Sequence, residues 1–310
     1  MKKLYIEPTS MCNLSCRTCF RNNWFDEEQG VMPDEVLKEI YSFIKKSRNL
    51  ESVMLAGMGE PLLHEKIVEI VKQISLSGKK VELLTNGTLL TKAMSEELVK
   101  AGLDALWVSC DEAHIQSTGT SGALSKNIEC FNNIRKNKCK LCFTFVVEKN
   151  CTHDIYEFAE KFRADKINIS GAIPFSPVGK MVGLNTILGK NCFEYKNYCP
   201  FINEEKCFVK WNGEVSPCMQ LLHNSYTYLF EEKRKVTSYS FGNLLKNNLE
   251  EIWNSKEYCE FREKVKKFEF PDCTLCNGCD DRLENKTDCM FNEMPTCGAC
   301  LWAQNIARCP

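Results

Sequence analysis

The chain has 310 residues, of which 44% are hydrophobic and 10% aromatic, enough for a sizeable core and about two domains. Forty basic and 41 acidic residues leave a net charge of −1, which excludes the strongly basic surface of a nucleic-acid-binding protein. No apolar run reaches the roughly 20 residues of a membrane span, and the start lacks the apolar stretch of a signal peptide. We therefore expect a cytoplasmic protein that binds neither nucleic acid nor membranes.

The first 173 residues alternate short β-branched or aromatic runs with amphipathic segments. Strands are predicted at Leu4–Glu7, Ser52–Ala56, Val81–Thr85, Ala105–Ser109, Lys140–Val147 and Lys166–Ser170. Helices are predicted between them at Asp34–Lys46, Glu65–Ser75, Lys92–Ala101, Lys126–Lys136 and His153–Phe162. Six units are too few for a closed eightfold barrel, so this alternation predicts a partial (β/α)6 TIM-type barrel of the α/β class, with its active site at the C-terminal strand ends.

After Ile173 this pattern gives way to a loop-rich connection, so we divide the chain into a barrel domain, residues 1–180, and a small Cys-rich α+β domain, residues 181–310. In the second domain, residues 207–218 predict a hairpin with an Asn-Gly turn. Residues 243–253 and 256–267 predict helices.

Twenty cysteines are far more than an ordinary chain of this length carries. Three lie between Cys12 and Cys19, and twelve between Cys192 and Cys309. Disulfides and buried packing are the alternatives, but disulfide frameworks suit small secreted domains. Clustering at short spacing favours metal ligation, because the ligands of one ion or cluster have to converge. The scattered cysteines expected in the core are Cys110, Cys130, Cys139, Cys142 and Cys151.

Cys12, Cys16 and Cys19 follow the first predicted strand and therefore occupy a loop at the mouth of the barrel. Their x3 and x2 spacing suits a 4Fe–4S cluster with one iron left without a protein ligand, whereas a structural zinc site requires a fourth ligand. The motif resembles the signature of the radical S-adenosylmethionine (SAM) superfamily. The resemblance implies that these cysteines hold the catalytic cluster, that the open iron chelates SAM, and that reductive cleavage releases a 5′-deoxyadenosyl radical.

Loops at the other predicted strand ends resemble the SAM-binding segments of that family. The residues that the resemblance implies in SAM binding are Gly57, Gly59, Glu60, Asn86, Ser109 and Ser170, with Phe20 covering the adenine. The family usually has an aromatic residue directly before the third cysteine, where this chain has Thr18. Its arginine for the SAM carboxylate has no counterpart between Asp111 and Ile134, so that contact is unassigned.

The C-terminal third resembles the SPASM extension, the auxiliary-cluster domain of many radical SAM enzymes. The resemblance implies two auxiliary 4Fe–4S clusters, which need about eight thiolates, whereas ten are available. The candidate ligands are Cys199, Cys207, Cys218, Cys273, Cys276, Cys279, Cys289, Cys297, Cys300 and Cys309. The spacing after Cys279 departs from the family pattern, so the ligands of each cluster are unassigned, and zinc is the alternative for the paired cysteines.

Both ends of the chain resemble a narrower branch, the maturases associated with tungsten-cofactor oxidoreductases of the aldehyde:ferredoxin oxidoreductase type. Sulfatase-maturing relatives carry an aspartate base after the cysteine that matches Cys218, where this chain has Met219. We therefore predict a radical SAM maturase that modifies a partner tungsten oxidoreductase or its cofactor. Its partners are then a protein or peptide substrate and a low-potential electron donor such as ferredoxin or flavodoxin.

Two other functions stay open. One is the radical modification of a ribosomally made peptide, forming a thioether or carbon–carbon crosslink, with a separate protein supplying the peptide-binding domain. The other is a non-enzymatic iron–sulfur electron carrier or zinc module. Among the histidines, His64 is expected as a solvated residue at a helix start, and His223 shows no partnered arrangement in the sequence.

Overall fold

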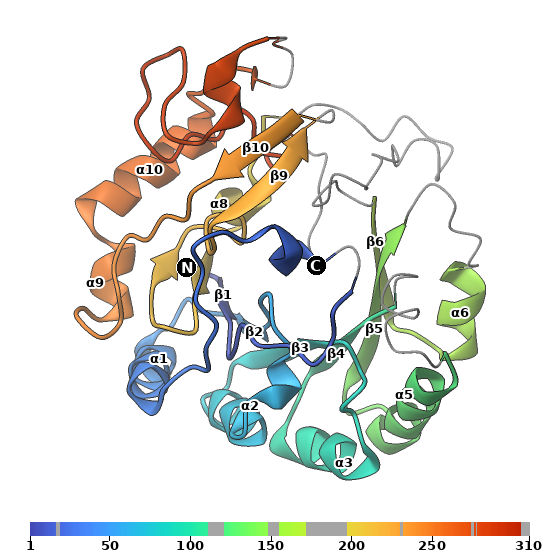
Figure 1. Ribbon diagram of the computed structural model, residues 1–310. Helices are drawn as coiled ribbons and strands as arrows, with labels where there is room; N and C mark the ends of the chain where they lie inside the picture. Colours follow the sequence, from blue (N-terminus) through green and yellow to red (C-terminus); the bar gives the residue numbers. More distant parts are fainter. Residues whose placement is uncertain are drawn as a thin grey trace.

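A computed structural model describes residues 1–16, 19–110, 121–147, 155–171, 197–229, 232–273, 276 and 278–304. Its main element is a curved eight-stranded sheet with the order β6-β5-β4-β3-β2-β1-β7-β8 (Figure 1). The strands are β1 (Lys3–Ile6), β2 (Ser52–Leu55), β3 (Lys80–Thr85), β4 (Ala105–Ser109), β5 (Lys140–Val147), β6 (Lys166–Gly171), β7 (Lys206–Val209) and β8 (Val215–Ser216). Strands β1 to β7 are parallel, which confirms the predicted α/β class.

Helices cover the outer face of this sheet (Figure 1). They are α1 (Asp34–Lys46), α2 (Ile67–Leu76), α3 (Lys92–Ala101), α5 (Ser121–Arg135) and α6 (Ile155–Lys161). Helix α3 has both caps that its sequence predicts. The Thr91 hydroxyl accepts a hydrogen bond from the Met94 N–H, and Gly102 ends the helix in the left-handed region at φ 93°.

Alternate residues of each strand face two different cores. Leu4 and Ile6 of β1 pack with the outer helices, whereas Tyr5 between them faces the inside of the barrel. Met54 of β2 likewise belongs to the inner core. Each fully buried aliphatic side chain contributes about 1.5–3 kcal/mol to folding. The loop that follows β1 therefore starts from a strand packed on both faces.

Strand β7 joins the Cys-rich part of the chain to the barrel sheet. It pairs in parallel with β1, from Lys3 opposite Lys206 to Ile6 opposite Val209. The predicted hairpin is confirmed, because β8 pairs antiparallel with β7 across a turn where Gly213 has φ 88°. The predicted division between residues 180 and 181 lies outside the described residues and stays a prediction.

Most of the remaining elements pack around this extension of the sheet, but residues Pro61–Leu63 pack against β3 and α2. The remaining elements are η1 (Phe20–Asn23), η2 (Pro61–Leu63), α8 (Pro200–Asn203), β9 (Ser225–Leu229), β10 (Glu232–Val236), α9 (Leu249–Trp253), α10 (Lys256–Lys267) and η4 (Asp280–Leu283). The helix predicted over residues 243–253 is wrong in its first half. It begins only at Leu249, because the Asn248 side chain caps it by accepting a hydrogen bond from the Glu251 N–H.

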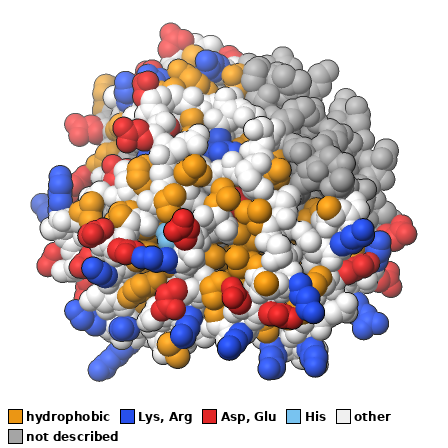
Figure 2. Space-filling model, turned by 60° about the horizontal axis from the view of Figure 1, so that its bottom comes forward, with side chains coloured by type: hydrophobic (Ala, Val, Ile, Leu, Met, Phe, Trp, Pro, Cys, Tyr) orange, Lys and Arg blue, Asp and Glu red, His pale blue; other side chains and the backbone are white. Residues whose placement is uncertain are grey.

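The face turned forward in Figure 2 carries basic and acidic side chains interspersed with one another around hydrophobic ones, without a continuous area of one charge. Within the described ranges, no helix is both long enough and apolar enough to cross a lipid bilayer.

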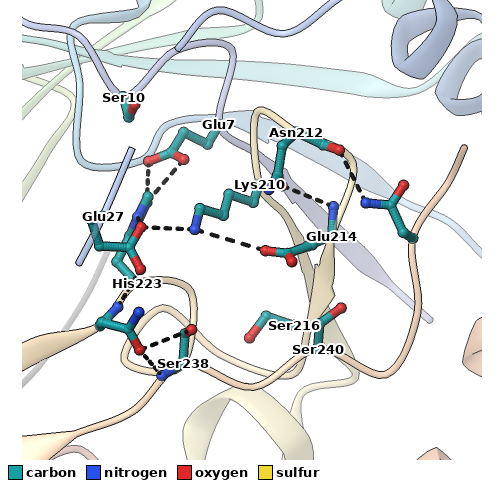
Figure 3. A network of polar contacts seen from close by, with 12 residues as sticks. Glu7, Ser10, Glu27, Lys210, Asn212, Glu214, Ser216, His223, Ser238 and Ser240 are labelled. Carbon is teal, nitrogen blue, oxygen red and sulfur yellow. Dashed lines mark hydrogen bonds and ion pairs between the residues drawn. The ribbon is translucent and has the colours of Figure 1, made fainter. Parts of the chain in front are cut away.

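A buried polar network ties the N-terminal loop to the C-terminal part of the chain (Figure 3). His223 Nε2 lies 3.0 Å from both carboxylate oxygens of Glu7, at the end of β1. Its Nδ1 lies 2.8 Å from Glu27 Oε2, which also accepts from Lys210 Nζ at 2.8 Å. The Trp24 ring stacks on the imidazole with centroids 4.3 Å apart. The side chains of Glu7, Glu27, Lys210 and His223 are almost fully buried, so the network fixes the segment that follows the cysteine motif.

The geometry makes His223 an imidazolium, because both ring nitrogens face carboxylates and so both must donate. Burial alone would lower the pKa of His223, but the charges and hydrogen bonds of Glu7 and Glu27 outweigh it and raise that pKa. The expectation that His223 has no partners is therefore wrong. The expectation of a solvated His64 is also wrong. His64 is 4% exposed and bonds to the backbone of Met32 and Lys66.

We predict that His223→Gln destabilises the protein most at low pH. The raised pKa means that the stabilisation is fully present below the unfolded value of 6.5 and is lost as the pH rises through the folded value. Breaking a buried ion pair costs about 3–5 kcal/mol. The free energy of unfolding, measured in urea at pH 6 and pH 9, should therefore differ from wild type most at pH 6.

His64→Gln is the matched control. His64 is also buried, but its hydrogen bonds go to the backbone of Met32 and Lys66 and it forms no ion pair within the described residues. This variant therefore removes a buried imidazole without breaking an ion pair. A deficit for His223→Gln that is equal at pH 6 and pH 9 would contradict the imidazolium assignment.

Candidate active site

The cysteine motif lies on the loop after β1, at the C-terminal ends of the parallel strands. Cys12, Cys16 and Cys19 are half-buried, and none forms a disulfide. Burial raises the pKa of the Cys12 thiol, and the nearby Arg21 guanidinium opposes this increase. Arg21 also donates to the Leu14 carbonyl oxygen at 2.8 Å, which fixes the loop between the first two cysteines.

Glu60, after β2, connects three strand-end loops. Its Oε1 accepts from the Thr85 hydroxyl at 2.7 Å and the Leu62 N–H at 3.0 Å, and its Oε2 accepts from the Asn86 N–H at 2.7 Å. The Glu60 N–H donates to the Met11 carbonyl oxygen at 2.7 Å. Burial raises the pKa of Glu60, and the three hydrogen bonds to its carboxylate oppose this. The carboxylate thus organises the loops from within, and its predicted contact with SAM stays a prediction.

The glycines of the same turn allow it to pack directly on the motif loop. A Cβ added at Gly59 would lie 2.3 Å from the Thr9 carbonyl oxygen and 2.4 Å from the Met11 carbonyl oxygen. A Cβ at Gly57 would lie 2.4 Å from the Glu7 side chain. Gly59 is therefore required for close approach between backbones, and Gly57 for close approach of the backbone to the Glu7 side chain.

Asn86, after β3, contacts the first cysteine of the motif. Its Nδ2 donates to Asn13 Oδ1 at 2.9 Å and lies 3.8 Å from Cys12 Sγ. Its Oδ1 accepts from the Thr88 N–H at 2.9 Å. The structure therefore brings Asn86, one of the predicted SAM-binding residues, to the cysteine motif.

Phe20 lies between the motif and the C-terminal segment. Its ring stacks on that of Trp302, with centroids 6.1 Å apart and an interplanar angle of 23°. Ser109 is half-buried at the end of β4, in line with its predicted position at the barrel mouth. Ser170 lies in β6, but its side chain is outside the described part of the structure. The SAM contacts of all three residues stay predictions.

Four cysteines far apart in the sequence come together in the C-terminal part. The thiols of Cys297, Cys199 and Cys218 each lie near that of Cys300, and burial is the main cause that raises the pKa of every one of them. We call Cys199, Cys218, Cys297 and Cys300 the first cysteine group. Cys199 and Cys218 are buried in the inner core, and Cys297 and Cys300 are half-buried against it. Four thiols match in number the ligand set of one cluster.

A second cysteine group surrounds Cys273. Burial raises the pKa of Cys273 to about 11, with further contributions from Asp288, Cys289 and Cys276. Cys279, three residues after Cys276 in the sequence, directly precedes η4 as its N-cap residue. The second group therefore comprises Cys273, Cys276 and Cys289, with Cys279 adjacent in the chain. Cys309 lies outside the described residues.

Cys207 belongs to neither group. It lies in β7 with its side chain in the outer core, whereas Cys199, Cys218 and Cys273 belong to the inner core. Burial raises its pKa to about 12, and the neighbours that influence its charge are Tyr258 and Arg262, not other cysteines. The structure thus separates Cys207 from the other candidate ligands that it describes. The alternation of inner and outer residues along β7 was the available sequence signal.

Within the described residues, no three His, Cys, Asp or Glu side chains converge closely enough to hold a single metal ion. A four-iron cluster is larger than one ion, so its thiolates stand further apart than those of a zinc site. Both cysteine groups fit such a cluster by their thiol chemistry, and the motif of Cys12, Cys16 and Cys19 fits one that leaves an iron open.

Two cavities lie at opposite ends of the barrel. A small one of about 40 Å³ lies at the C-terminal strand ends, where Glu7 and Tyr5 are the ionisable residues of a mainly apolar lining that includes Met219 and Leu222. A larger one of about 910 Å³ lies at the N-terminal strand ends, lined by Lys80 and Lys140 among others. We assign the active site to the small cavity's end, because the cysteine motif lies there and parallel barrels carry their chemistry on that side.

We predict that Gly59→Ala displaces the motif loop and lowers SAM cleavage at least about tenfold, because overpacking against backbone costs about 1–3 kcal/mol. The measurement is 5′-deoxyadenosine formation after iron–sulfur reconstitution. Gly122→Ala in α5 is the control, since its added Cβ meets nothing within 4 Å. Cleavage by Gly59→Ala at the wild-type rate would show that the turn does not position the loop.

Known proteins share this arrangement along the whole chain. The sequence model of the radical SAM superfamily matches residues 6–166, and that of SPASM, an iron–sulfur cluster-binding domain, matches residues 199–280. A tungsten-containing aldehyde ferredoxin oxidoreductase cofactor-modifying protein from Pyrococcus furiosus is 30% identical over 348 aligned positions, covering all of this chain and 97% of that protein.

Solved structures share the fold at lower sequence identity. The anSMEcpe structure with bound AdoMet and Cp18Cys peptide has a TM-score of 0.63 and 19% identity, covering 98% of this chain and 96% of that one. Streptococcus suis SuiB bound to its precursor peptide SuiA has a TM-score of 0.59 and 17% identity, covering 84% and 66% of the two chains. Together with the superfamily match to more than half of the residues, the full-length relative shows that this chain belongs to the radical SAM superfamily, as an enzyme that uses 4Fe–4S clusters and SAM.

Proposed function

We propose that this enzyme modifies a tungsten-containing oxidoreductase of the aldehyde:ferredoxin type, or its cofactor. The observation that carries the proposal is the 30% identity to the Pyrococcus furiosus cofactor-modifying protein over the whole of both chains. The GTP 3′,8-cyclase from Pyrococcus abyssi, by contrast, is matched over only 35% of this chain. The similarity to the Pyrococcus furiosus protein extends through the Cys-rich part as well as the barrel. It therefore favours a substrate class shared with that protein, and not only the radical chemistry that the barrel provides.

The three-cysteine motif is the proposed catalytic site. A 4Fe–4S cluster bound there supplies the electron that splits SAM into methionine and a 5′-deoxyadenosyl radical. The chain's own part is to position this group. Glu60 and Gly59 hold the motif loop against the ends of β2 and β3, and Asn86 contacts Cys12. The network around His223 fixes the following segment and covers it with the C-terminal part.

The two cysteine groups are the proposed auxiliary cluster sites. Cys199, Cys218, Cys297 and Cys300 provide a complete set of four ligands. The group around Cys273 provides the second site, with Cys279 as the proposed fourth ligand. We propose that electrons reach these sites from a low-potential donor such as ferredoxin or flavodoxin in the cytoplasm.

Modification of a ribosomally made peptide is the second candidate. It is favoured by the small cavity at the barrel mouth, which is mainly apolar and is lined by Met219, Leu222 and Glu7 among others. A single side chain of an extended peptide is small enough to reach such a cavity.

The test is to incubate the reconstituted enzyme with SAM, a reductant and a tungsten oxidoreductase produced without this protein. We expect 5′-deoxyadenosine above the level seen without the partner, together with a mass change in the oxidoreductase or its cofactor. In Cys16→Ala, SAM cleavage should be lost while the C-terminal iron is retained, because Cys16 belongs to neither auxiliary group.

Cys130→Ala, on the outer helix α5, is the matched control and should retain full activity. Stimulation of SAM cleavage by a ribosomal peptide but not by the oxidoreductase would favour the second candidate. An iron-loaded protein that never cleaves SAM would overturn both proposals.

The assignment of the auxiliary ligands gives a separate prediction. Cys218→Ala should lose about four irons per chain, the content of one cluster, whereas Cys207→Ala should keep the wild-type iron content. Both thiols are buried, at 9% and 0% exposure, so the two variants are comparable in their effect on packing. Iron is measured by colorimetric assay after anaerobic reconstitution. Equal iron loss in both variants would show that Cys207 is a ligand.

A further inference from the structure

Arg234 is a buried cation without a carboxylate partner. It lies on β10 and is 3% exposed. Its Nε donates to the Arg282 carbonyl oxygen at 3.0 Å and its Nη2 to the Glu284 carbonyl oxygen at 3.4 Å. Within the described residues it forms no ion pair, whereas buried Arg135 pairs with Asp165 and Arg282 pairs with Glu232.

A guanidinium stays protonated inside proteins, so burial leaves its charge in place. Carbonyl oxygens solvate that charge in part but do not neutralise it. A buried charge in this position requires a compensating negative charge nearby. The question is which group supplies it.

The groups whose negative charge acts on Arg234 are thiols from both cysteine groups. Cys300 and Cys297 belong to the first group and Cys273 to the second. The packing agrees with this placement. Val236, two residues along β10 and therefore on the same face of the strand, lies in the inner core with Cys199, Cys218 and Cys273. Arg234 is thus a neighbour of thiols from both groups.

We propose that Arg234 is the shared counter-charge of the two auxiliary clusters and holds the reduction potential of both at a higher value. This inference rests on the proposed assignment of the two cysteine groups to clusters. A 4Fe–4S cluster with four thiolates is anionic, and reduction adds one more negative charge. A fixed positive charge beside it therefore stabilises the reduced state more than the oxidised one.

The test uses a background in which Cys12, Cys16 and Cys19 are all replaced by Ala, so that only C-terminal iron remains. In that background we compare Arg234→Met, Arg234→Lys and the control Arg135→Met by iron content and by a redox titration followed by electron paramagnetic resonance. We expect Arg234→Met to shift the potentials of both auxiliary clusters to more negative values. Arg234→Lys should shift them less, and Arg135→Met should not shift them.

The other possible results for the Arg234 variants also support or overturn the inference. Iron lost in Arg234→Met but kept in Arg234→Lys also supports the inference, because the charge then holds the clusters. Unchanged potentials in Arg234→Met, a shift in one cluster alone, or equal iron loss in both Arg234 variants would overturn it. A background protein without any C-terminal iron would instead refute the assignment of the cysteine groups, which is part of the proposed function.

Discussion

The hydrogen bonds of one buried carboxylate, that of Glu60, determine how the loops at the barrel mouth lie relative to one another. The residue follows β2, its side chain binds the end of β3, and its backbone N–H binds the loop after β1. Three neighbouring strands thereby present their ends in a fixed arrangement. The cysteine motif has no secondary structure of its own around Cys12, so its shape depends on this support. The preorganisation that radical chemistry needs comes from outside the motif.

Local patterns were sufficient to predict the barrel. Each predicted strand matches an observed one to within one residue at either end, because β-branched runs between amphipathic segments leave little choice of structure. The helix over residues 243–253 failed for an equally local reason. Its apolar spacing fits a helix, but the Asn248 cap starts the helix late, and the Asn243 side chain accepts the Leu245 N–H in a turn instead.

What the sequence could not reveal are contacts between distant segments. The partners of His223 are Glu7 and Glu27, about two hundred positions away, and no short pattern encodes them. The sorting of the cysteines depends in the same way on tertiary structure, since Cys199 and Cys218 meet Cys297 and Cys300 only in the folded chain. Even so, neighbouring residues of a strand face opposite sides of the sheet, so Cys207 and Phe208 of β7 have to face different cores. This alternation is a sequence signal that places Cys207 on the side of the outer helices.

The continuous pairing of β1 with β7 has a mechanical consequence. Enzymes that move charge between separate domains rely on hinges, and the separation of their redox centres varies as the hinge opens. Here four consecutive residue pairs bind the strand before the cysteine motif to the strand that leads into the auxiliary region. A hinge motion of the barrel relative to the Cys-rich part would have to break the hydrogen bonds between β1 and β7 inside the sheet. The distance between the cysteine motif and the Cys-rich part of the chain is consequently built into the backbone and does not vary with opening and closing.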